Sequence, residues 1–584
     1  MKYSSIPSAQ TVVLHCKAKG IENIIISPGS RNAPLTIGFT EDPFFKCFSI
    51  VDERSAAFFA LGIAQQLRTP VAVVCTSGSA LLNYYPAIAE AFYSNIPLVV
   101  ISSDRPSYKI DVGDGQTIRQ DHVFHRHIGY SANLKQDVVH STGRVLKYAP
   151  ELLAGITTAE AQKEVQDYND REVNTAINLA FKSGLPIHIN VPFEEPLYDV
   201  LAEPSVMPNI TMPPAEIAEG TKNIAEVVRP WNAATKKMVL VGVNHHNTVE
   251  QRFLDMLAND PSVVVFTEST SNLHHPNFFP SIDSIVAPIE KSKEKEALFS
   301  KLQPEILLTF GGLIVSKKIK AFLREYKPVQ HWHIDPLKAY DTFFSLTQHF
   351  KMDANGFFGE FINYSRPVES DYHSYWSGIK KAYQQKREAY LDQIPFSDFS
   401  AFGMITKNIP RNYNVQLANS STVRYAQLFD LDKSIRVHCN RGTSGIDGST
   451  STAIGASQYA DDPTLLITGD LSFLYDSNGL WNNYIRPDFK IILINNAGGG
   501  IFRILPGKEE TTNFKTYFET VQNYDVSHLC KMYEIDYNLV NDKVMLEKNL
   551  KDFFQQKTGA SLLEVRTPRL LNDKILFGYF DFIS

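Results

Sequence analysis

Two apolar runs near the C-terminus end in oxygen-bearing side chains: Leu465-Leu466-Ile467-Thr468-Gly469-Asp470 and Ile491-Ile492-Leu493-Ile494-Asn495-Asn496, the second followed by Ala497-Gly498-Gly499-Gly500. Short apolar runs of this kind indicate buried strands. Residues 476–484 between them are able to form a helix, so the segment predicts a βαβ unit with parallel strands. Both strand ends then lie at the edge where open α/β sheets bind ligands.

The two strand ends carry the ligand types that a hard cation prefers. Asp470 and Asn496 supply a carboxylate and an amide oxygen, and the glycine-rich turn supplies backbone carbonyls. Mg²⁺ prefers such oxygens and keeps other positions for water or phosphate. An Asp after a strand is also a common helix N-cap, and Asn-Gly turns are common at strand ends. The oxygen ligands at the two strand ends together nevertheless predict a metal-bridged diphosphate.

Length and composition are those of a large globular protein. The chain has 584 residues, of which 43% are hydrophobic and 21% charged, ordinary values for a soluble protein of three or four domains. The net charge of −6 argues against a nucleic-acid binder but allows a local basic pocket. A polar N-terminus and the lack of an apolar run of membrane-spanning length lead us to expect a cytoplasmic protein.

The cysteines indicate neither a disulfide framework nor a zinc site. They are five in number, widely spaced and free of any C-x-x-C arrangement, and such spacing is typical of neither. We expect Cys16 and Cys75, which lie in apolar stretches, to be small buried hydrophobes.

Apolar runs alternate with amphipathic stretches in three blocks, which is the pattern of doubly wound α/β domains. The first block has strand candidates at residues 24–26, 71–75, 98–101 and 187–191. A proline-rich segment at 192–214 is predicted to be a linker that crosses between domains. The second block has strand candidates at 239–241, 263–265 and 306–309, and a helix at 317–326. A helical stretch at 372–391 precedes the third block, which runs from about residue 415 to residue 563.

Cationic side chains follow several of the predicted strands. Arg31, in Ser27-Pro28-Gly29-Ser30-Arg31, can clamp a carboxylate through two hydrogen bonds, although a surface salt bridge explains an isolated arginine equally well. Further cations at loop positions weigh against that simpler explanation: Arg105, Lys317 with Lys318, Arg424 and Arg441. Five cationic loci predict a pocket for a substrate that carries several carboxylates.

Other candidate residues have both a functional and a structural explanation. Glu53 lies where a strand passes into a helix, and a first-turn glutamate is favourable to the helix dipole. Gln116 can orient a substrate or a water through its amide, or simply occupy a turn. Ile446, Ile501 and Phe502, beside glycine-rich loops, either wall an apolar part of the site or pack in the core.

Together these residues resemble the MenD family, the thiamine diphosphate-dependent synthases of menaquinone (vitamin K2) biosynthesis. The resemblance runs nearly end to end. It is most specific at Ser27 to Arg31 with Pro34-Leu35-Thr36, Asp52-Glu53-Arg54-Ser55, Ser103-Asp104-Arg105-Pro106, Asn190-Val191-Pro192-Phe193, Asn440 to Gly448, Gly469-Asp470-Leu471-Ser472 and Leu474-Tyr475-Asp476. Asp470 with Asn496 matches the family's cofactor motif, and Leu471 in place of the usual glycine is this family's own form.

The resemblance implies three doubly wound parallel-sheet domains of the α/β class. They are a pyrimidine-binding domain at 1–195, a central domain at 196–370 and a diphosphate-binding domain at 371–584. It also implies a homodimer or homotetramer with active sites between chains, in which Glu53 serves a cofactor held by the partner subunit's Asp470. A carboxyl group on the pyrimidine nitrogen N1′ favours the imino tautomer that removes the thiazolium C2 proton, and a glutamate shielded from water suits this role.

The reaction that the resemblance implies is a transferase reaction with thiamine diphosphate and Mg²⁺ or Mn²⁺ as cofactors. The cofactor's ylide adds to 2-oxoglutarate, CO₂ leaves, and the succinyl-carbanion equivalent adds 1,4 to isochorismate. The product is 2-succinyl-5-enolpyruvyl-6-hydroxy-3-cyclohexene-1-carboxylate. Two rival functions remain open: another thiamine-dependent 2-oxo acid carboligase or decarboxylase, and a non-catalytic cofactor-binding protein on the same scaffold.

The family's site residues carry over position by position. The implied metal ligands are Asp470, Asn496 and the Gly498 carbonyl. The other implied cofactor contacts are Glu53, Arg441, Ile446, Leu471, Ser472, Gly499, Ile501 and Phe502. The implied catalytic residues are Glu53, Ser30, Arg31, Gln116 and Ser420, and the implied substrate-binding residues are Arg105, Lys317, Lys318, Asn419 and Arg424. This chain departs from the family at Gly115 and Ala497, where asparagine can occur, and at Lys318, where arginine can occur; a lysine lacks arginine's planar two-point grip.

Overall fold

The computed structural model describes residues 2–153, 155–213, 224–505, 509–556 and 558–584. The chain packs into two compact units. The first comprises Met1–Ala215, Gly442–Asp461 and Tyr475–Arg486, and the second comprises Glu216–Arg441, Asp462–Leu474 and Pro487–Ser584. Among the described residues, no helix is both long enough and apolar enough to cross a membrane.

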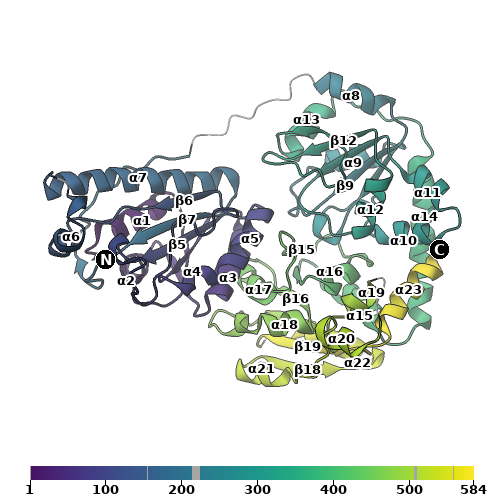
Figure 1. Ribbon diagram of the computed structural model, residues 1–584. Coiled ribbons are helices and arrows are strands. Elements are labelled where there is room, and N and C mark those ends of the chain that lie inside the picture. The colour runs from purple at the N-terminus through teal and green to yellow at the C-terminus, as the bar shows by residue number, and fades with distance from the viewer. Residues whose placement is uncertain (1, 154, 214–223, 506–508, 557) are drawn as a thin grey trace. The chain divides into compact units, whose positions relative to one another are not determined.

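A six-stranded parallel sheet forms the centre of the first unit (Figure 1). Its order is β3-β2-β4-β5-β7-β6, with β2 (Asn23–Ile26), β3 (Lys46–Ser49), β4 (Val71–Cys75), β5 (Leu98–Asp104), β6 (Tyr130–Asn133) and β7 (Ile187–Pro192). The four strands predicted in this block are confirmed. Apolar residues of β2, β4, β5 and β7 share a core with the buried faces of α1 (Pro7–Ala18) and α7 (Thr158–Ser183). Cys16 and Cys75 are both buried, as predicted.

Two helices of the first unit pack in backbone contact. They are α3 (Glu53–Leu67), which follows β3, and α17 (Ser449–Ser457). A Cβ at Gly62 of α3 would lie 2.1 Å from the Thr452 carbonyl oxygen, and a Cβ at Gly455 of α17 would lie 2.0 Å from the Phe59 carbonyl oxygen. Only glycine allows helices to approach this closely, so these two positions fix how α3 and α17 meet.

The second unit contains two parallel sheets. The central one has the order β10-β9-β11-β12-β13, with β9 (Lys237–Val241), β10 (Val263–Phe266), β11 (Ile306–Phe310), β12 (Gln330–Ile334) and β13 (Leu346–Phe350). The last has the order β15-β14-β16-β17-β19-β18, with β14 (Asn414–Leu417), β15 (Arg436–Cys439), β16 (Thr464–Gly469), β17 (Lys490–Asn495), β18 (Asp536–Val540) and β19 (Ser561–Arg566). Three parallel sheets with intervening helices confirm the predicted α/β class.

Several helices of the second unit position the candidate site. They are α10 (Asp283–Lys291), α12 (Lys317–Glu325), α14 (Tyr372–Gln393), α15 (Asp398–Asn408) and α16 (Ser421–Ala426). The predicted helices at 317–326 and 372–391 correspond to α12 and α14. Helix α15 packs against α16 and against α22 (Lys543–Gln555) and α23 (Asn572–Ile583). Its first residue, Asp398, thereby comes to lie beside the ends of β17 and β19.

Two local predictions are wrong. The helix between β16 and β17 is α18 (Asp470–Tyr475), followed by a 3-10 turn at Ser477–Leu480, and does not span 476–484. Asp470 itself begins the helix, while Asp476 instead accepts hydrogen bonds from the Ser451 backbone N–H at 2.7 Å and hydroxyl at 3.0 Å. The proline-rich segment at 192–214 is also not a bare linker, because β8 (Val200–Leu201) pairs antiparallel with β1 (Tyr3–Ser4). Its last residue, Pro214, lies outside the described residues.

Candidate active site

The pairing of β16 with β17 brings the predicted metal ligands to one sheet edge. Gly469 lies opposite Ile494 in parallel register, so the residues that follow both strands meet there. Asp470 is only 3% exposed. Its Oδ1 accepts the Leu471 backbone N–H at 2.9 Å and its Oδ2 accepts the Gln522 side-chain amide at 2.8 Å.

Burial controls the charge of Asp470. It raises the pKa of this carboxyl to about 6, against hydrogen bonds from Gln522, Leu471 and Gly498 that lower the pKa. A buried carboxylate is costly without a counter-charge. An adjacent divalent cation would favour the ionised form, so the environment of Asp470 suits a metal ligand.

Asn496 is oriented by a buried carboxylate. Its Nδ2 donates to Asp398 Oδ2 at 2.9 Å, which leaves Oδ1 as the end of the amide that can bind a cation. Asp398, only 2% exposed, also accepts the Thr567 hydroxyl on Oδ1 at 2.6 Å. Burial raises the pKa of Asp398, while the hydrogen bonds from Thr567 and Asn496 lower it.

The glycine-rich turn after Asn496 is held by a distant segment. Gly498 has φ +148°, and a Cβ there would lie 2.7 Å from the Glu519 carbonyl oxygen. That oxygen accepts the Gly499 backbone N–H at 2.6 Å, and the Gln522 backbone N–H donates to the Ala497 carbonyl at 3.3 Å. The turn is therefore fixed in a conformation that glycine allows, and Gln522 contacts both the turn and Asp470.

The donor set at this edge fits a hard divalent cation. One carboxylate, one amide oxygen and one main-chain carbonyl are the oxygen ligands that Mg²⁺ binds while keeping sites for phosphate. In the described part of the chain, no cluster of three or more His, Cys, Asp or Glu side chains is placed to hold a metal. The other predicted cofactor contacts of the second unit lie on this edge or follow it: Leu471 and Ser472 in α18, Gly499 in the turn, and Ile501 and Phe502 in α19 (Ile501–Ile504).

Arg441 and Asn419 are joined at the ends of β15 and β14. Arg441 is 8% exposed and its Nη1 donates to Asn419 Oδ1 at 2.6 Å. Asn419 Nδ2 in turn donates to the Asn440 carbonyl at 2.7 Å. Ser420 follows with φ +67° and is the N-cap of α16, which carries Arg424. Burial, and next the charge of Arg441, lowers the pKa of Arg424, so the two cations lie within electrostatic reach of each other.

The N-terminus of α12 carries the predicted lysines. Lys317 is exposed, whereas the Lys318 ammonium is already in an ion pair with Glu290 of α10. Sequence reasoning missed Lys320, which lies three residues after Lys317 and so on the same side of the helix. Burial lowers the pKa of Lys320, and Glu268, Arg441 and Arg424 lie within its electrostatic reach.

Glu268, also missed, anchors the start of α12. Its buried carboxylate accepts the Val315 backbone N–H at 2.8 Å and the Ser316 backbone N–H at 2.7 Å. Burial raises the pKa of Glu268 to about 7, while these hydrogen bonds and the charge of Arg441 lower it. No local sequence signal marks this residue, because its partners are 47 and 48 positions away.

Glu53 is the first residue of α3, in the first unit. Asp52 is the N-cap and accepts the Ser55 backbone N–H at 3.2 Å. Glu53 is half-buried in the single chain, so the predicted shielding from water is incomplete there. Burial, and to a lesser degree the charge of Glu53, raises the pKa of Cys75 at the end of β4. The carboxylate therefore lies within electrostatic reach of the carboxyl end of β4.

Arginines gather at that same edge of the first sheet. Arg31, 7% exposed, donates from Nη1 to the Phe193 carbonyl at 3.1 Å and from Nη2 to Glu195 Oε1 at 3.2 Å. Arg105 donates from Nη1 to Ser77 Oγ at 2.6 Å. Burial, and next the charge of Arg31, lowers the pKa of Arg105, so the two guanidinium groups lie within electrostatic reach of each other. Arg31 thus has an internal carboxylate partner that the sequence did not reveal.

The remaining predicted residues of the first unit are more exposed. Ser30 precedes Arg31 and is exposed. Gln116 has φ +56°, and its carbonyl oxygen would lie 3.1 Å from a Cβ at Gly78, so its loop packs on the turn after β4. Ile446, 37% exposed, lies in the loop before α17. In the first unit the predicted residues other than Ile446 thus lie at the carboxyl end of the first sheet. In the second unit they lie at the carboxyl end of the last sheet and at the start of α12.

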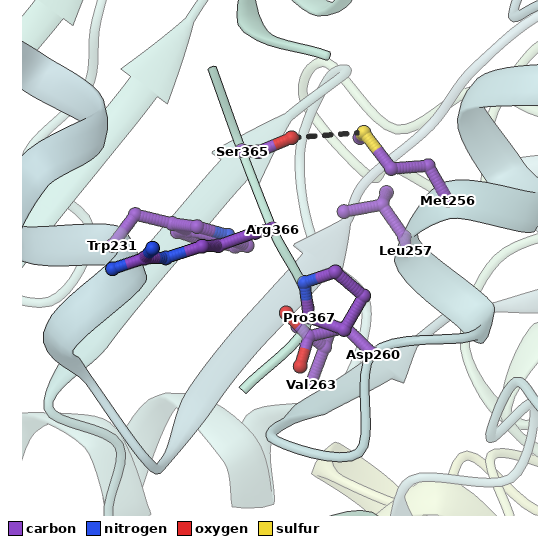
Figure 2. Close-up of a pocket in the computed structure, with 8 residues that line it drawn as sticks. All are labelled: Trp231, Met256, Leu257, Asp260, Val263, Ser365, Arg366 and Pro367. Atoms are coloured by element: carbon purple, nitrogen blue, oxygen red, sulfur yellow. Dashed lines mark hydrogen bonds between the residues drawn. The ribbon is translucent and has the colours of Figure 1, made fainter. Parts of the chain in front are cut away.

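One cavity of the second unit lies apart from these groups. Figure 2 shows a cavity of about 30 Å³ beside the central sheet, lined by Trp231, Met256, Leu257, Asp260, Val263, Ser365, Arg366 and Pro367. That volume holds about one or two water molecules. Its lining includes none of the predicted site residues, and the Ser365 hydroxyl is 3.4 Å from Met256 Sδ.

Comparison with known families defines the class of the protein. Residues 8–128 match the family described as thiamine pyrophosphate enzyme, N-terminal TPP binding domain. Residues 419–565 match its counterpart, the C-terminal TPP binding domain. The first match contains Glu53, Arg31 and Arg105, and the second contains Asp470 and Asn496. The fold and the two domain matches together are those of a thiamine diphosphate-dependent enzyme.

Curated relatives narrow the class further. The chain is 55% identical over 587 residues to the 2-succinyl-5-enolpyruvyl-6-hydroxy-3-cyclohexene-1-carboxylate synthase of Christiangramia forsetii, covering 100% of both chains. It is 53% identical to the synthase of the same name from Flavobacterium johnsoniae, over 99% of both chains. A third, from Porphyromonas gingivalis, is 37% identical over 97% of this chain and 95% of the relative. The chain belongs to the 2-succinyl-5-enolpyruvyl-6-hydroxy-3-cyclohexene-1-carboxylate synthase family.

Proposed function

We propose that this chain condenses 2-oxoglutarate with isochorismate, with loss of CO₂, to give 2-succinyl-5-enolpyruvyl-6-hydroxy-3-cyclohexene-1-carboxylate in menaquinone biosynthesis. The observation that carries the proposal is the full-length identity of 55% to a synthase named for this product. The geometry supports it independently, because a metal-type donor set and cationic groups lie at the carboxyl edges of parallel sheets.

Asp470, Asn496 and the Gly498 carbonyl would hold Mg²⁺ or Mn²⁺, and through it the cofactor diphosphate. Supporting this assignment, Asp470 is buried and its Oδ2 is held by Gln522 at 2.8 Å, while Asn496 is oriented by Asp398 at 2.9 Å. When bound, thiamine diphosphate supplies a nucleophilic thiazolium carbon and takes up the electron pair released with CO₂. Leu471, Ser472, Gly499, Ile501 and Phe502 would surround it.

Glu53 would hold a proton at the pyrimidine nitrogen N1′ of that cofactor. Glu53 begins α3 and is half-buried in one chain. We propose that a second copy of the chain supplies the rest of its cover, in a homodimer or homotetramer with active sites between chains. A glutamate enclosed in this way would be suited to holding a proton.

The cations would bind the carboxylates of the two substrates. In the first unit these are Arg31 and Arg105, with Ser30 and Gln116 beside them. In the second they are Arg424, Lys317, Lys318 and Arg441, with Asn419 and Ser420. Guanidinium groups suit carboxylates because they donate two parallel hydrogen bonds. Since Arg31 and Lys318 already pair with Glu195 and Glu290, substrate carboxylates would have to compete with these two side chains.

The direct test mixes purified protein with 2-oxoglutarate, isochorismate, thiamine diphosphate and Mg²⁺. We expect isochorismate-dependent consumption of 2-oxoglutarate and appearance of the product by mass spectrometry. No such consumption would refute the proposal. Turnover of pyruvate, or a copurified flavin, would instead indicate another thiamine-dependent carboligase. Cofactor binding without exchange of the C2 proton would indicate a non-catalytic binding protein.

A further inference from the structure

Asp398 lies behind the proposed metal site, and its hydrogen bond to Asn496 has a consequence for metal binding beyond the function proposed above. It is the first residue of α15 and is 98 positions from Asn496, whose Nδ2 donates to its Oδ2 at 2.9 Å. Asp398 is 2% exposed and Asn496 is 7% exposed. A buried carboxylate is placed directly behind the amide that would bind the metal.

The second oxygen of Asp398 is fixed by its own partner. The Thr567 hydroxyl donates to Oδ1 at 2.6 Å. The hydroxyl oxygen accepts in turn from Asn572 Nδ2 at 3.3 Å, which assigns its proton to the bond with Asp398. The Asp398 backbone N–H donates to Asn572 Oδ1 at 2.8 Å. Thr567 and Asn572 thus hold Asp398 in one orientation, so that Oδ2 faces Asn496.

An amide has two chemically different ends of nearly the same shape. Only its oxygen can bind a cation, and its NH₂ group only donates. A carboxylate accepts hydrogen bonds and, when ionised, donates none. Because Asp398 only accepts hydrogen bonds, the NH₂ group of Asn496 points toward Asp398. The Oδ1 of Asn496 then points toward the proposed metal position. We infer that Asp398 is a positioning residue that selects the metal-binding orientation of Asn496.

The inference rests on the proposed metal set and makes a specific prediction for Asp398→Asn. The Thr567 hydroxyl would donate to the oxygen of the new amide, so the NH₂ group of that amide would face Asn496 and turn the Asn496 oxygen inward. The NH₂ group of Asn496 would then point at the cation. Loss of a residue that orients a metal ligand typically costs about 10- to 100-fold in metal affinity, and we expect a loss of that size.

A double variant that exchanges the side chains at positions 398 and 496 should restore metal binding. In Asn496→Asp alone, two buried carboxylates face each other, and we expect one of them to hold a proton because like charges so close do not both ionise. In the double variant Asp398→Asn with Asn496→Asp, the amide at 398 donates to the carboxylate at 496, which keeps an oxygen for the metal. We expect its affinity to return to within about threefold of the wild type, a coupling that two independent sites do not show.

The experiment titrates Mn²⁺ into full-length protein in the presence of thiamine diphosphate and follows free Mn²⁺ by electron paramagnetic resonance. Circular dichroism confirms folding. The matched control is Asp137→Asn, a buried carboxylate with two comparable donors, the Ser8 backbone N–H at 2.9 Å and Gln162 Nε2 at 2.7 Å. We expect Asp137→Asn to bind Mn²⁺ as the wild type does, whatever its effect on stability.

The outcomes separate this inference from the proposed function. Weak binding by folded Asp398→Asn, with rescue in the double variant, supports the inference. If the wild type binds Mn²⁺, Asp470→Asn does not, and Asp398→Asn matches the wild type, the inference is overturned while the metal site stands. If the wild type itself does not bind, both fail. Should Asp398→Asn not fold, the double variant decides: affinity near the wild type supports the inference, and a loss of about tenfold or more overturns it.

Discussion

The first and last sheets of this chain have the same strand order and different chemistry at their carboxyl edges. Both follow one pattern, β3-β2-β4-β5-β7-β6 in the first and β15-β14-β16-β17-β19-β18 in the last. The edge of the last sheet carries Asp470 and Asn496, both buried and held by internal hydrogen bonds. The edge of the first sheet carries cations and the half-buried Glu53. Under the proposed function, the last edge would hold its metal ligands in place before the metal binds, whereas Glu53 at the first edge would gain its cover only from a partner subunit.

The helices that follow the first-listed strands of the two sheets, α3 and α17, also differ in how their N-termini are capped. Helix α3 follows β3 and α17 follows β15, and each needs a cap for its first-turn N–H groups. Asp52, the N-cap residue of α3, accepts the Ser55 backbone N–H at 3.2 Å. The N-cap of α17 is Gly448, which has no side chain, so Asp476 caps the Ser451 backbone N–H from 25 positions away, at 2.7 Å.

The largest expected effect is on the first edge. Glu53→Gln should lower turnover by about two to four orders of magnitude, because the carboxyl would take part in proton transfer. Thiamine diphosphate affinity should change by no more than a few-fold. Steady-state assays and a cofactor titration measure the two quantities, with exposed Glu22→Gln as the matched control. Turnover above about a tenth of the wild type would show that Glu53 does not have this role.

The last edge should respond in the opposite way. Asp470→Asn removes the one charged ligand of the proposed metal set, and ligand charge strongly sets the affinity for hard cations. We expect Mg²⁺-dependent thiamine diphosphate binding to weaken by at least about a hundredfold. Calorimetric titration measures this, with exposed Asp461→Asn as the control. Cofactor binding like the wild type, with only turnover lost, would remove the distinction between the two edges.

Strand positions at both edges were predictable, whereas several partners of the site were not. The runs at 24–26, 71–75 and 465–468 are apolar and β-branched, and this local pattern fixes buried strands. Asp470 and Asn496 were predictable because they follow such runs. The helix expected at 476–484 was wrong because the contact of Asp476 with Ser451 is not local.

Side-chain partners far along the chain explain what the site predictions lacked. Glu195 pairs with Arg31 from 164 positions away, and Asp398 orients Asn496 from 98 positions away. Hydrophobic periodicity carries no information on such pairs, because only the folded chain brings them together. Lys320 is different: its spacing of three from Lys317 places both on one helical face, and that signal was available in the sequence.

The close packing of α3 on α17 makes a prediction on stability. Gly455→Val would place side-chain atoms against the Phe59 backbone, where a Cβ already lies 2.0 Å from the carbonyl oxygen. We expect a loss of about 3 kcal/mol or more in the free energy of unfolding, the upper end of typical overpacking. The control is Gly378→Val in α14, where nothing lies within 4 Å of a Cβ. Equal urea midpoints for the two variants would contradict the packing argument.

The cap of α17 gives the smallest effect and a pH dependence. Burial raises the pKa of Asp476 from 3.8 to about 6, although its bonds to Ser451 lower it. Its contribution to stability is therefore full below about pH 4 and is lost as pH rises through about 6. At about 1.4 kcal/mol per unit of pKa, the loss is up to about 3 kcal/mol.

Asp476→Asn should remove the part of the pH dependence of the unfolding free energy that comes from Asp476. We expect the difference in unfolding free energy between variant and wild type to move in favour of the variant between pH 4 and pH 7. Urea unfolding at several pH values measures it, with Asp52→Asn, at the half-buried cap of α3, as the comparison. Parallel profiles for Asp476→Asn and the wild type would show that the carboxyl at 476 is not held as described.

The most direct test asks whether the two edges serve one cofactor between chains. Glu53→Gln and Asp470→Asn, each inactive alone, are coexpressed with different tags, and the mixed dimer is isolated by tandem affinity purification. If Glu53 of one chain meets the partner subunit's Asp470, one of the two sites in the mixed dimer is fully wild type, and activity should return to about half of the wild-type value. Activity no higher than that of the two parents would contradict the account, because a site built within one chain is never repaired by mixing.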